Sequence, residues 1–341
     1  MSESPSVSEG WGERWRRRAV TIPGYFLGTV LLVSALPLLL MLTLVADGLG
    51  RRSWAWSRAV LVATHYLVCE CLGLWVAFVL WLASPLVARE RYLAWNFALQ
   101  NRWACALFAG VQLLYGLQVE KRDRQLLEGA GPVLVFIRHS SLADTLLPAV
   151  FLSSELGWRL RYLLKRELLW DPCLDVVGQR LPNVFVRRGS GEIEREMLAV
   201  SALARGLESD EGVLIYPEGT RFSPAKRERA IASLQRAGHE DLVRRASSME
   251  HLLPPKLSGA LALFDAMPEA DVVVVGHVGF EGIASAGDVA GGALIGRRLR
   301  LRFWRSMVPE DPRVRPDWLY DRWAEIDAWI EETAIGGGSS S

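Results

Sequence analysis

The chain has 341 residues, which is long enough for one large domain or two smaller ones. Hydrophobic residues make up 50% of it, a fraction that is high for a soluble enzyme and low for a polytopic transporter. Its 39 basic and 38 acidic residues leave a formal charge of +1, which argues against nucleic acid as the main partner.

The cysteines argue against a disulfide scaffold. The chain has four cysteines. Cys69, Cys71 and Cys105 lie in or near the apolar N-terminal third, and Cys173 lies further along the chain. Cys69 and Cys71 do not have the C-x-x-C spacing of a redox or zinc site. We therefore expect no disulfide framework, no metal and no cofactor, and a reducing compartment for the main domain.

Residues 1–22 are predicted to form a disordered, basic N-terminus. Met1–Glu9 is polar and rich in serine, a composition typical of disorder. Trp11–Arg18 combines tryptophan with a cluster of arginines, which suits an anionic membrane surface. The cluster consists of Arg14, Arg16, Arg17 and Arg18.

Residues 23–118 are predicted to be a membrane anchor. Gly24–Ala46 is a run of 23 uncharged residues, and a membrane helix needs about 20. Ala59–Ala88 is a second apolar run, interrupted by Glu70, for which we expect a role in helix packing or at an interface. Ala104–Gly116 is too short to span and is expected to be an interfacial or core-packing helix. Two full spans and a hairpin within one leaflet both fit. We expect the domain that follows to face the cytoplasm.

Residues 119–335 have a different pattern, in which short β-branched runs alternate with helical stretches. The predicted strands are Val133–Ile137, Leu160–Leu164, Val184–Val186, Val213–Tyr216, Val272–Val275 and Leu299–Trp304. The predicted helices are Asp144–Leu156, Glu192–Glu208 and Leu257–Met267, with a charged helical insertion over Ser223–Glu250 and a closing helix over Trp318–Thr333. This alternation predicts an α/β fold with a mostly parallel sheet flanked by helices. The Gly/Ser tail, residues 336–341, is left out of the argument.

A histidine follows the first of these strands. His139 comes directly after Val133–Ile137, and Asp144 stands five residues later, where the next helix is expected to begin. A carboxylate beside an imidazole fixes its tautomer and stabilises its protonated form, which leaves the other ring nitrogen free to accept a proton from a hydroxyl group. Taken alone, this spacing also fits a loop histidine beside a helix-capping aspartate.

Three further motifs lie where other strands end. Lys165-Arg166-Glu167-Leu168 leads to a strand that ends at Arg187 and Arg188. Tyr216-Pro217-Glu218-Gly219-Thr220-Arg221 follows another strand, and Leu253-Pro254-Pro255-Lys256-Leu257-Ser258-Gly259 opens a helix. Ligands of open α/β sheets gather beyond the carboxyl ends of the strands. We therefore expect these motifs to meet His139 in one crevice, where a base beside several guanidinium groups suits a substrate with a hydroxyl and a phosphate.

These motifs, in this order and behind a membrane anchor, resemble the four-motif signature of the glycerolipid acyltransferases. This family contains the 1-acylglycerol-3-phosphate acyltransferases and lysophospholipid acyltransferases. The resemblance covers about Val119 to Phe280, and the insertion resembles that of the longer eukaryotic-type and lysocardiolipin-like branch. Tyr216 stands where the family often has Phe. Arg187 stands where an acidic residue or Asn is common, so either Arg187 or Arg188 is the expected phosphate ligand.

The resemblance implies transfer of an acyl group from acyl-CoA or acyl carrier protein to the free hydroxyl of a lysophospholipid. The expected acceptor is 1-acylglycerol-3-phosphate, which would give phosphatidic acid. His139 would be the general base, Asp144 its orienting partner, and Lys165 a stabiliser of the oxyanion. The acceptor phosphate would be held by Arg188 or Arg187 and by Glu218, Gly219, Thr220 and Arg221. Pro255 and Lys256, in the fourth motif, would shape the acyl or thioester pocket.

Other functions fit the residues less well. One alternative is a remodelling acyltransferase that acts on lysophosphatidylglycerol, lysophosphatidylinositol or lysocardiolipin. The sequence does not determine the oligomeric state. A serine hydrolase using Ser140 or Ser141 would lack a G-x-S-x-G elbow. No nucleotide-binding glycine motif appears. An inactive membrane scaffold is the remaining alternative, although His139 and Asp144 are both present.

Overall fold

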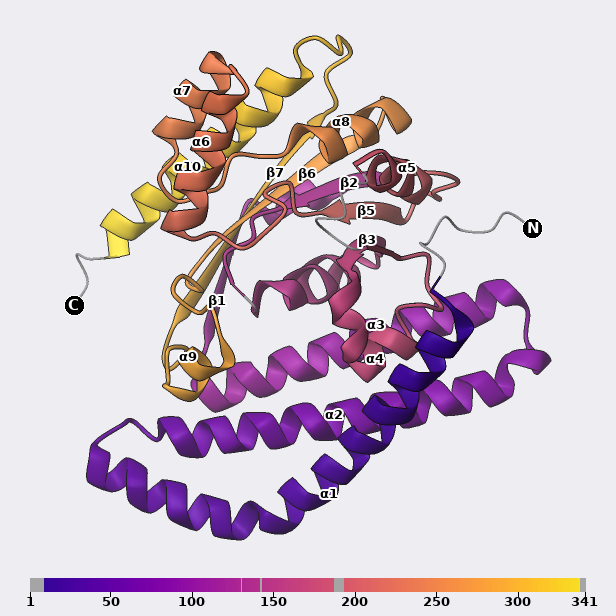
Figure 1. Cartoon of the computed structure of the whole chain (residues 1–341), viewed down its shortest axis with the longest axis vertical. Helices are drawn as coiled ribbons and strands as arrows, with labels where there is room; N and C mark the ends of the chain where they lie inside the picture. Colours follow the sequence, from indigo (N-terminus) through magenta and orange to yellow (C-terminus); the bar gives the residue numbers. More distant parts are fainter. Residues whose placement is uncertain (1–8, 130, 142, 187–192, 338–341) are drawn as a thin grey trace. The chain divides into compact units, whose positions relative to one another are not determined.

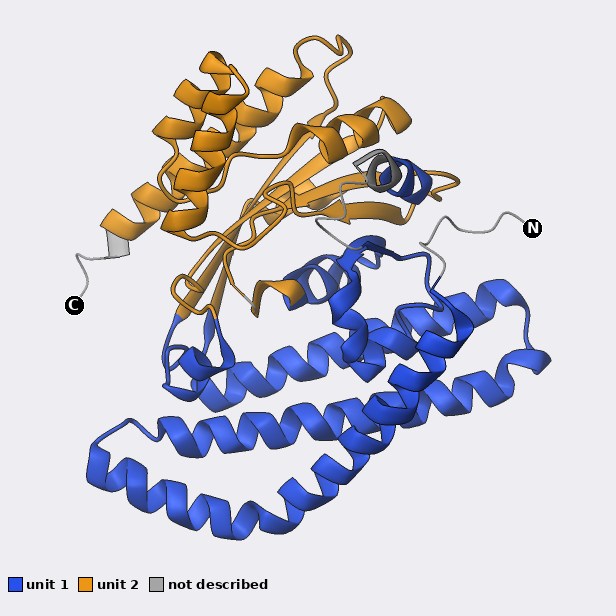
Figure 2. Cartoon of the chain, in the orientation of Figure 1, with its two compact units in different colours: residues 1–118, 146–203, 285–297 blue, residues 119–145, 204–284, 298–341 orange. Residues whose placement is uncertain are grey.

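The structure of the protein is a computed structural model that describes residues 9–129, 131–141, 143–186 and 193–337 (Figure 1). The chain divides into two compact units, coloured separately in Figure 2. Unit 1 consists of residues 1–118, 146–203 and 285–297, and unit 2 of residues 119–145, 204–284 and 298–341. The predicted disorder of Met1–Glu9 falls almost wholly outside the described residues.

Unit 1 contains three long helices and a small two-stranded portion of sheet. The helices are α1 (Trp11–Gly50), α2 (Ala55–Ala83) and α3 (Arg89–Tyr115). The strands β3 (Arg159–Lys165) and β4 (Val184–Val186) pair in parallel. The shorter helical segments are η1 (Ser84–Leu86), η4 (Ala149–Ser154), η5 (Arg166–Trp170), α4 (Pro172–Val176), α5 (Ile193–Leu203) and α9 (Ala286–Ala290).

Unit 2 is a sheet with helices packed on it. Its strands are β1 (Gln118–Arg122), β2 (Val133–Ile137), β5 (Glu211–Ile215), β6 (Asp271–Val278) and β7 (Arg298–Met307), in the order β1-β7-β6-β2-β5. β2 is parallel to β5 and β6, and β7 is antiparallel to β6. The helical segments are η2 (Arg124–Leu127), η3 (Ala143–Leu146), α6 (Pro224–Arg236), α7 (Glu240–Ser248), α8 (Leu257–Ala266) and α10 (Arg315–Gly337). The mostly parallel sheet flanked by helices is thus confirmed.

The core of unit 2 follows from its strand sequences. Every residue of β2 and β5 is buried, as expected for central parallel strands that are covered on both faces. The register pairs Phe136 of β2 with Ile215 of β5, and Ile137 of β2 with Val275 of β6. The chain therefore leaves β2 and β5 at the same edge of the sheet, and His139 and Tyr216–Arg221 follow these strands there.

The long helices of unit 1 expose apolar side chains. On α1, Leu31 is 60% exposed and Met41 57%, and on α2, Trp75 is 59% exposed. Two helical segments, Trp11–Gly50 and Ala55–Leu86, are long and apolar enough to cross a membrane. Such extensive apolar exposure marks a surface that meets lipid or a partner.

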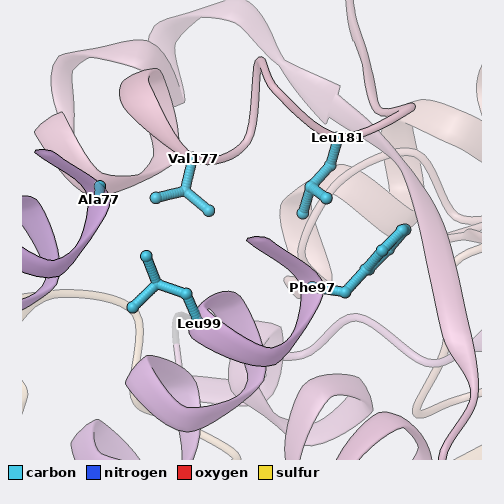
Figure 3. Close-up of a cluster of buried hydrophobic side chains, with 5 residues drawn as sticks. All are labelled: Ala77, Phe97, Leu99, Val177 and Leu181. Atoms are coloured by element: carbon cyan, nitrogen blue, oxygen red, sulfur yellow. The ribbon is translucent and has the colours of Figure 1, made fainter. Parts of the chain in front are cut away.

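Other side chains of α2 and α3 form a protein core instead. Figure 3 shows Ala77 of α2, Phe97 and Leu99 of α3, and Val177 and Leu181 from the segment after α4 gathered in one buried cluster. These helices are therefore built into unit 1 on one side.

The structure and the contacts of the N-terminal basic cluster differ from those predicted. α1 begins at Trp11, so residues 11–22 are helical rather than disordered. Arg17 is only 7% exposed, and its guanidinium donates to both carboxylate oxygens of Asp175, at 2.9 and 3.1 Å. Arg18 donates to the same carboxylate, and Arg17 also pairs with Glu9. These arginines therefore bind carboxylates of unit 1, which is a different role from the predicted contact with lipid head groups.

Three further elements differ from the predictions. The expected helix Asp144–Leu156 is broken into the 3-10 turn η3 and the π-helical turn η4, because Pro148 between them has no N–H to donate to the carbonyl of Asp144. The expected short helix Ala104–Gly116 is the second half of α3, whose buried residues continue at helical spacing from Asn96. Strand β1 was not predicted, because its sequence QVEKR is polar. The charged insertion is helical as predicted and forms α6 and α7.

Candidate active site

His139 and Asp144 form a hydrogen-bonded pair at the end of β2. Nδ1 of His139 lies 2.9 Å from Oδ1 of Asp144. Because a carboxylate can only accept, Nδ1 carries the proton and Nε2 presents its lone pair. Nε2 makes no hydrogen bond to any residue that the structure describes, and the His139 side chain is 13% exposed. The pair therefore has the geometry of a general base with its orienting partner.

Asp144 is fully buried and fixes the loop as well as the imidazole. Its Oδ2 accepts hydrogen bonds from the backbone N–H of Ser140, at 2.7 Å, and of Ser141, at 2.8 Å. Burial alone would raise the pKa of Asp144, but hydrogen bonds from His139 and His277 hold this pKa well below its ordinary value. Asp144 is therefore a carboxylate over the whole physiological pH range.

The backbone of His139 is held by the motif that follows β5. Its N–H donates to Oε1 of Glu218 at 2.8 Å, and its carbonyl accepts from the N–H of Phe222 at 2.8 Å. The ring of Tyr216 packs on the imidazole, with 4.4 Å between ring centroids. The parallel register of β2 and β5 brings these residues together, and the Tyr216 ring limits rotation of the imidazole.

Glu218 lies inside the protein. It is 2% exposed, and its second oxygen, Oε2, accepts from the N–H of Leu253 at 3.1 Å. Burial raises the pKa of Glu218 to about 8, against the opposing effect of the backbone N–H groups of His139 and Leu253 and of the Arg138 charge. Glu218 was predicted to help hold a substrate phosphate. The structure instead uses both of its oxygens to join the first and fourth motifs to the third.

The turn after Glu218 requires glycine. Gly219 has a φ of +71°, and its N–H donates to the carbonyl of Tyr216 at 2.8 Å. A Cβ at Gly219 would stand 3.0 Å from Cε of Lys256, so the lysine side chain lies across the turn. The N–H of Lys256 also donates to the carbonyl of Pro217, at 2.9 Å, and Pro255 beside it is buried.

Three cations surround this turn. Arg221 donates to the carbonyl of Ala284 at 2.8 Å, and Lys226 donates to Oγ1 of Thr220 and to the carbonyl of Arg221, at 3.0 and 2.9 Å. Among the described residues, no carboxylate lies within 4 Å of Arg221, Lys226 or Lys256. Partial burial and the positive charges of Arg221 and Arg229 lower the pKa of Lys226. Uncompensated positive charge of this kind favours an anionic ligand.

Three residues near the site were not predicted from the sequence: Lys226, Arg138 and His277. Lys226 was assigned to the insertion, although a lysine in the first turn of a helix that begins just after Arg221 can reach back to the turn. Arg138 is 1% exposed, and its guanidinium binds Glu281 at 2.5 Å and the carbonyl of His277. His277 lies on the strand β6, where its sequence neighbours are apolar, so the sequence contains no signal for it.

The remaining predicted residues belong to other parts of the chain. Lys165 is the last residue of β3 and lies in unit 1. Arg187 and Arg188 lie outside the described residues, so their roles stay predictions. Across the parts of the chain that the structure describes, no group of three or more His, Cys, Asp and Glu side chains could hold a metal ion.

Comparison with known proteins places these residues in context. A family model described as Acyltransferase matches residues 118–275. A curated relative, the 1-acyl-sn-glycerol-3-phosphate acyltransferase epsilon of Mus musculus, is 24% identical in an alignment of 240 residues that covers 66% of this chain and 62% of the relative. The chain thus spans less than two thirds of that relative.

A solved structure shares the fold. The crystal structure of the 1-acyl-sn-glycerophosphate (LPA) acyltransferase PlsC from Thermotoga maritima superposes with a TM-score of 0.52 and 15% sequence identity. The match covers 83% of this chain and 96% of that chain.

Proposed function

We propose that the chain, which is similar to the glycerolipid acyltransferases, acylates the free hydroxyl of a lysophospholipid. The proposed acceptor is 1-acylglycerol-3-phosphate, the product is phosphatidic acid, and the donor is acyl-CoA or acyl carrier protein. The observation that supports this proposal most is the hydrogen bond of His139 to the buried Asp144, with Nε2 of His139 left without a partner among the described residues.

The proposed reaction needs one base and no covalent enzyme intermediate. Nε2 of His139 takes the proton of the acceptor hydroxyl while the hydroxyl oxygen attacks the thioester carbonyl carbon. Asp144 stabilises the imidazolium that forms. When the tetrahedral intermediate collapses, the carbon–sulfur bond breaks, an ester forms, and the thiolate leaves with the proton from His139. Lys165 is the proposed donor to the oxyanion.

The cations around the Gly219 turn are the proposed site of the acceptor phosphate. Arg221, Lys226 and Lys256 have no carboxylate partner within the described residues, so an incoming phosphate does not compete with an existing ion pair. Arg188 or Arg187 is proposed to add a further guanidinium. A phosphate held at this turn would lie beside the backbone contacts that fix His139, which would bring the acceptor hydroxyl close to the base.

Membrane attachment is part of the proposal. The exposed apolar side chains of α1 and α2 and the length of the segments Trp11–Gly50 and Ala55–Leu86 support an anchor in the bilayer. The proposed acceptor and product are lipids that reside in a membrane, so an anchor would keep the site close to them. The catalytic domain is proposed to face the cytoplasm, where acyl-CoA and acyl carrier protein are found.

A lysolipid panel tests the function. Purified protein in phospholipid nanodiscs is incubated with labelled acyl-CoA or acyl carrier protein and with lysophosphatidate, lysophosphatidylglycerol, lysophosphatidylinositol or lysocardiolipin. We expect the highest kcat/KM with lysophosphatidate, and a value lower by about 10²–10⁴-fold in the His139→Ala variant. Preference for another lysolipid would identify a remodelling enzyme. If folded wild-type protein transferred no acyl group to any of these lysolipids, the alternative of an inactive membrane scaffold would be supported.

A further inference from the structure

A second buried imidazole contacts Asp144 on the side away from His139. His277 is fully buried and is the last but one residue of β6. Since Ile137 of β2 stands opposite Val275 of β6, His277 lies two residues beyond that pair, beside the loop that bears His139. The sheet register therefore positions this histidine against the candidate catalytic pair.

The contacts of His277 define its tautomer. Its Nε2 lies 3.1 Å from the carbonyl oxygen of Arg138 and 3.5 Å from Oδ2 of Asp144. Both neighbours can only accept, so Nε2 must carry a proton and donate it. Its Nδ1 is buried and has no hydrogen-bond partner among the described residues, so a second proton there would be buried without an acceptor. His277 therefore acts as a hydrogen-bond donor through Nε2.

We propose that His277 is a positioning residue for the His139–Asp144 pair, in the reaction proposed above. Its N–H bridges Asp144 and the carbonyl of Arg138, the residue before His139. One donor thus holds both ends of the loop that separates base and carboxylate. The same N–H draws negative charge toward Oδ2 and away from Oδ1, the oxygen that contacts His139, so the imidazole remains available as an unprotonated base.

Three carboxyl groups lie near His277, on Asp144, Glu218 and Glu281. Of these, Asp144 is the one that is ionised and has no arginine or lysine paired with it among the described residues. Arg138 pairs with Glu281 at 2.5 Å. Burial alone would raise the pKa of Glu281, but the Arg138 charge and hydrogen bonds keep this pKa below its ordinary value. Burial raises the pKa of Glu218 to about 8, so its charge is largely suppressed at neutral pH. The Asp144 carboxylate consequently relies on N–H donors, of which His277 is one.

Two substitutions of matched chemistry test this role. The amide N–H of glutamine can reach the position of Nε2, whereas that of asparagine corresponds to the position of Nδ1. His277→Gln should therefore retain kcat within a few-fold. His277→Asn and His277→Leu should lower kcat by about 10- to 100-fold, as expected from loss of a hydrogen bond to a charged group, with KM for donor and acceptor unchanged.

A second readout needs no substrate. Diethyl pyrocarbonate modifies unprotonated imidazoles, and mass spectrometry of the peptide that contains His139 gives the midpoint pH of its modification. Without the donor at residue 277, Asp144 presents more negative charge to His139 and favours its protonated form. The midpoint should therefore rise in His277→Asn and His277→Leu, and stay unchanged in His277→Gln.

The controls separate this role from folding and from the proposed function. His251→Gln alters a histidine whose side chain pairs with Glu331 and should change neither readout. A wild-type protein without transferase activity would refute the proposed function but leave the modification test valid. Equal losses in His277→Gln and in the two donor-less variants would overturn the proposal, as would unchanged kcat and midpoint in a folded donor-less variant.

Discussion

At the scale of single residues, the Asp144 carboxylate connects the imidazole of His139 to its loop. One oxygen accepts from His139, and the other accepts from the N–H groups of Ser140 and Ser141. A buried carboxylate with several donors is held in one orientation, and its partner imidazole is then oriented too. His139 can therefore act as a base without a separate activating group.

Replacing His139 by alanine tests its role as the base. His139→Ala removes the proton acceptor and should lower kcat by about 10²–10⁴-fold, while lysolipid binding is nearly intact. Steady-state kinetics on folded, membrane-bound protein provides the measurement. Tyr216→Phe is the control, because it keeps the ring that packs on His139 and should retain activity within a few-fold. Near-normal turnover of His139→Ala would refute the mechanism.

Arg221 is predicted to bind substrate without taking part in the chemistry. A guanidinium that holds the acceptor phosphate in both ground and transition states lowers KM and leaves kcat unchanged. Charge-assisted hydrogen bonds contribute about 1.5–3 kcal/mol. Arg221→Ala should thus raise KM for the lysolipid by roughly 10- to 100-fold, and Lys226→Ala should act in the same direction.

A two-substrate kinetic matrix measures this effect, with Arg236→Ala on the exposed surface of α6 as the control. KM for acyl-CoA should change far less than KM for the lysolipid. If Arg221→Ala weakened acyl-CoA and spared the lysolipid, the turn would hold the donor's phosphates, and the proposed acceptor site would be incorrect.

Glu218 makes the stability of the protein depend on pH. Burial raises the pKa of Glu218 from 4.5 to about 8 in the folded state. Between these values the unfolded chain has released the proton and the folded chain has kept it, so the free energy of unfolding falls as pH rises. The slope from this one group is at most about 1.4 kcal/mol per pH unit.

Unfolding of wild type and Glu218→Gln between pH 5 and 8 isolates this contribution. The substitution removes the titrating group, so the wild type should lose stability relative to the variant as the pH rises through this window. The variant should be less stable at pH 5 in absolute terms, because an amide nitrogen now faces one of the two backbone N–H donors. A difference between the two proteins that does not vary with pH would show that Glu218 is ionised in the folded state throughout.

At the scale of secondary-structure elements, the first turns of α1 are attached to α4. Arg17 and Arg18 both donate to the fully buried carboxylate of Asp175, and Gln179 donates to it at 2.5 Å. The segment Trp11–Arg18 is therefore part of the folded unit 1, and its arginines contribute to the attachment of α1.

Asp175→Asn should destabilise the protein. Breaking a buried ion pair costs about 3–5 kcal/mol, and the lower value applies because Glu9 still pairs with Arg17. Denaturant or thermal unfolding measures the loss. Asp241→Asn breaks the exposed pair between Asp241 and Arg244 on α7 and should cost less than about 1 kcal/mol. Similar values for the two variants would show that the Asp175 cluster contributes no more than a surface pair.

At the scale of the whole molecule, the length of α1 bears on how the chain meets a bilayer. Its 40 residues correspond to about 60 Å, twice the hydrocarbon thickness of about 30 Å. The helix contains Pro23 and Pro37, and Figure 1 shows it curving along its length. A single straight crossing therefore does not account for the helix, and its N-terminal turns serve as a protein contact.

Membrane attachment is predicted to be integral. The apolar faces of α1 and α2 should keep the protein in the membrane pellet after washing with high salt and with alkaline carbonate, and detergent should release it. These three extractions, followed by immunoblotting, are the measurement. Release by carbonate alone would mean a peripheral enzyme held by its surface.

Much of the architecture follows from the sequence by itself. The strands β2 and β4 have the predicted bounds, because runs such as Val133–Ile137 can be stable only when buried on both faces. The spacing of His139 and Asp144 places both on one short loop, so their contact is local and was predictable. The polar strand β1 was not, because its pairing at the sheet edge depends on a partner far along the chain.

Tertiary structure alone decided the environment of the site residues. The sequence does not distinguish Glu218, which is buried and bonded to two backbone N–H groups, from Arg221, which is more accessible at the same turn. It also contains no signal for His277, whose contact with Asp144 arises from the pairing of β2 with β6. Burial and pairing across strands join residues that lie from 35 to 139 positions apart in the chain, and local patterns cannot encode such contacts.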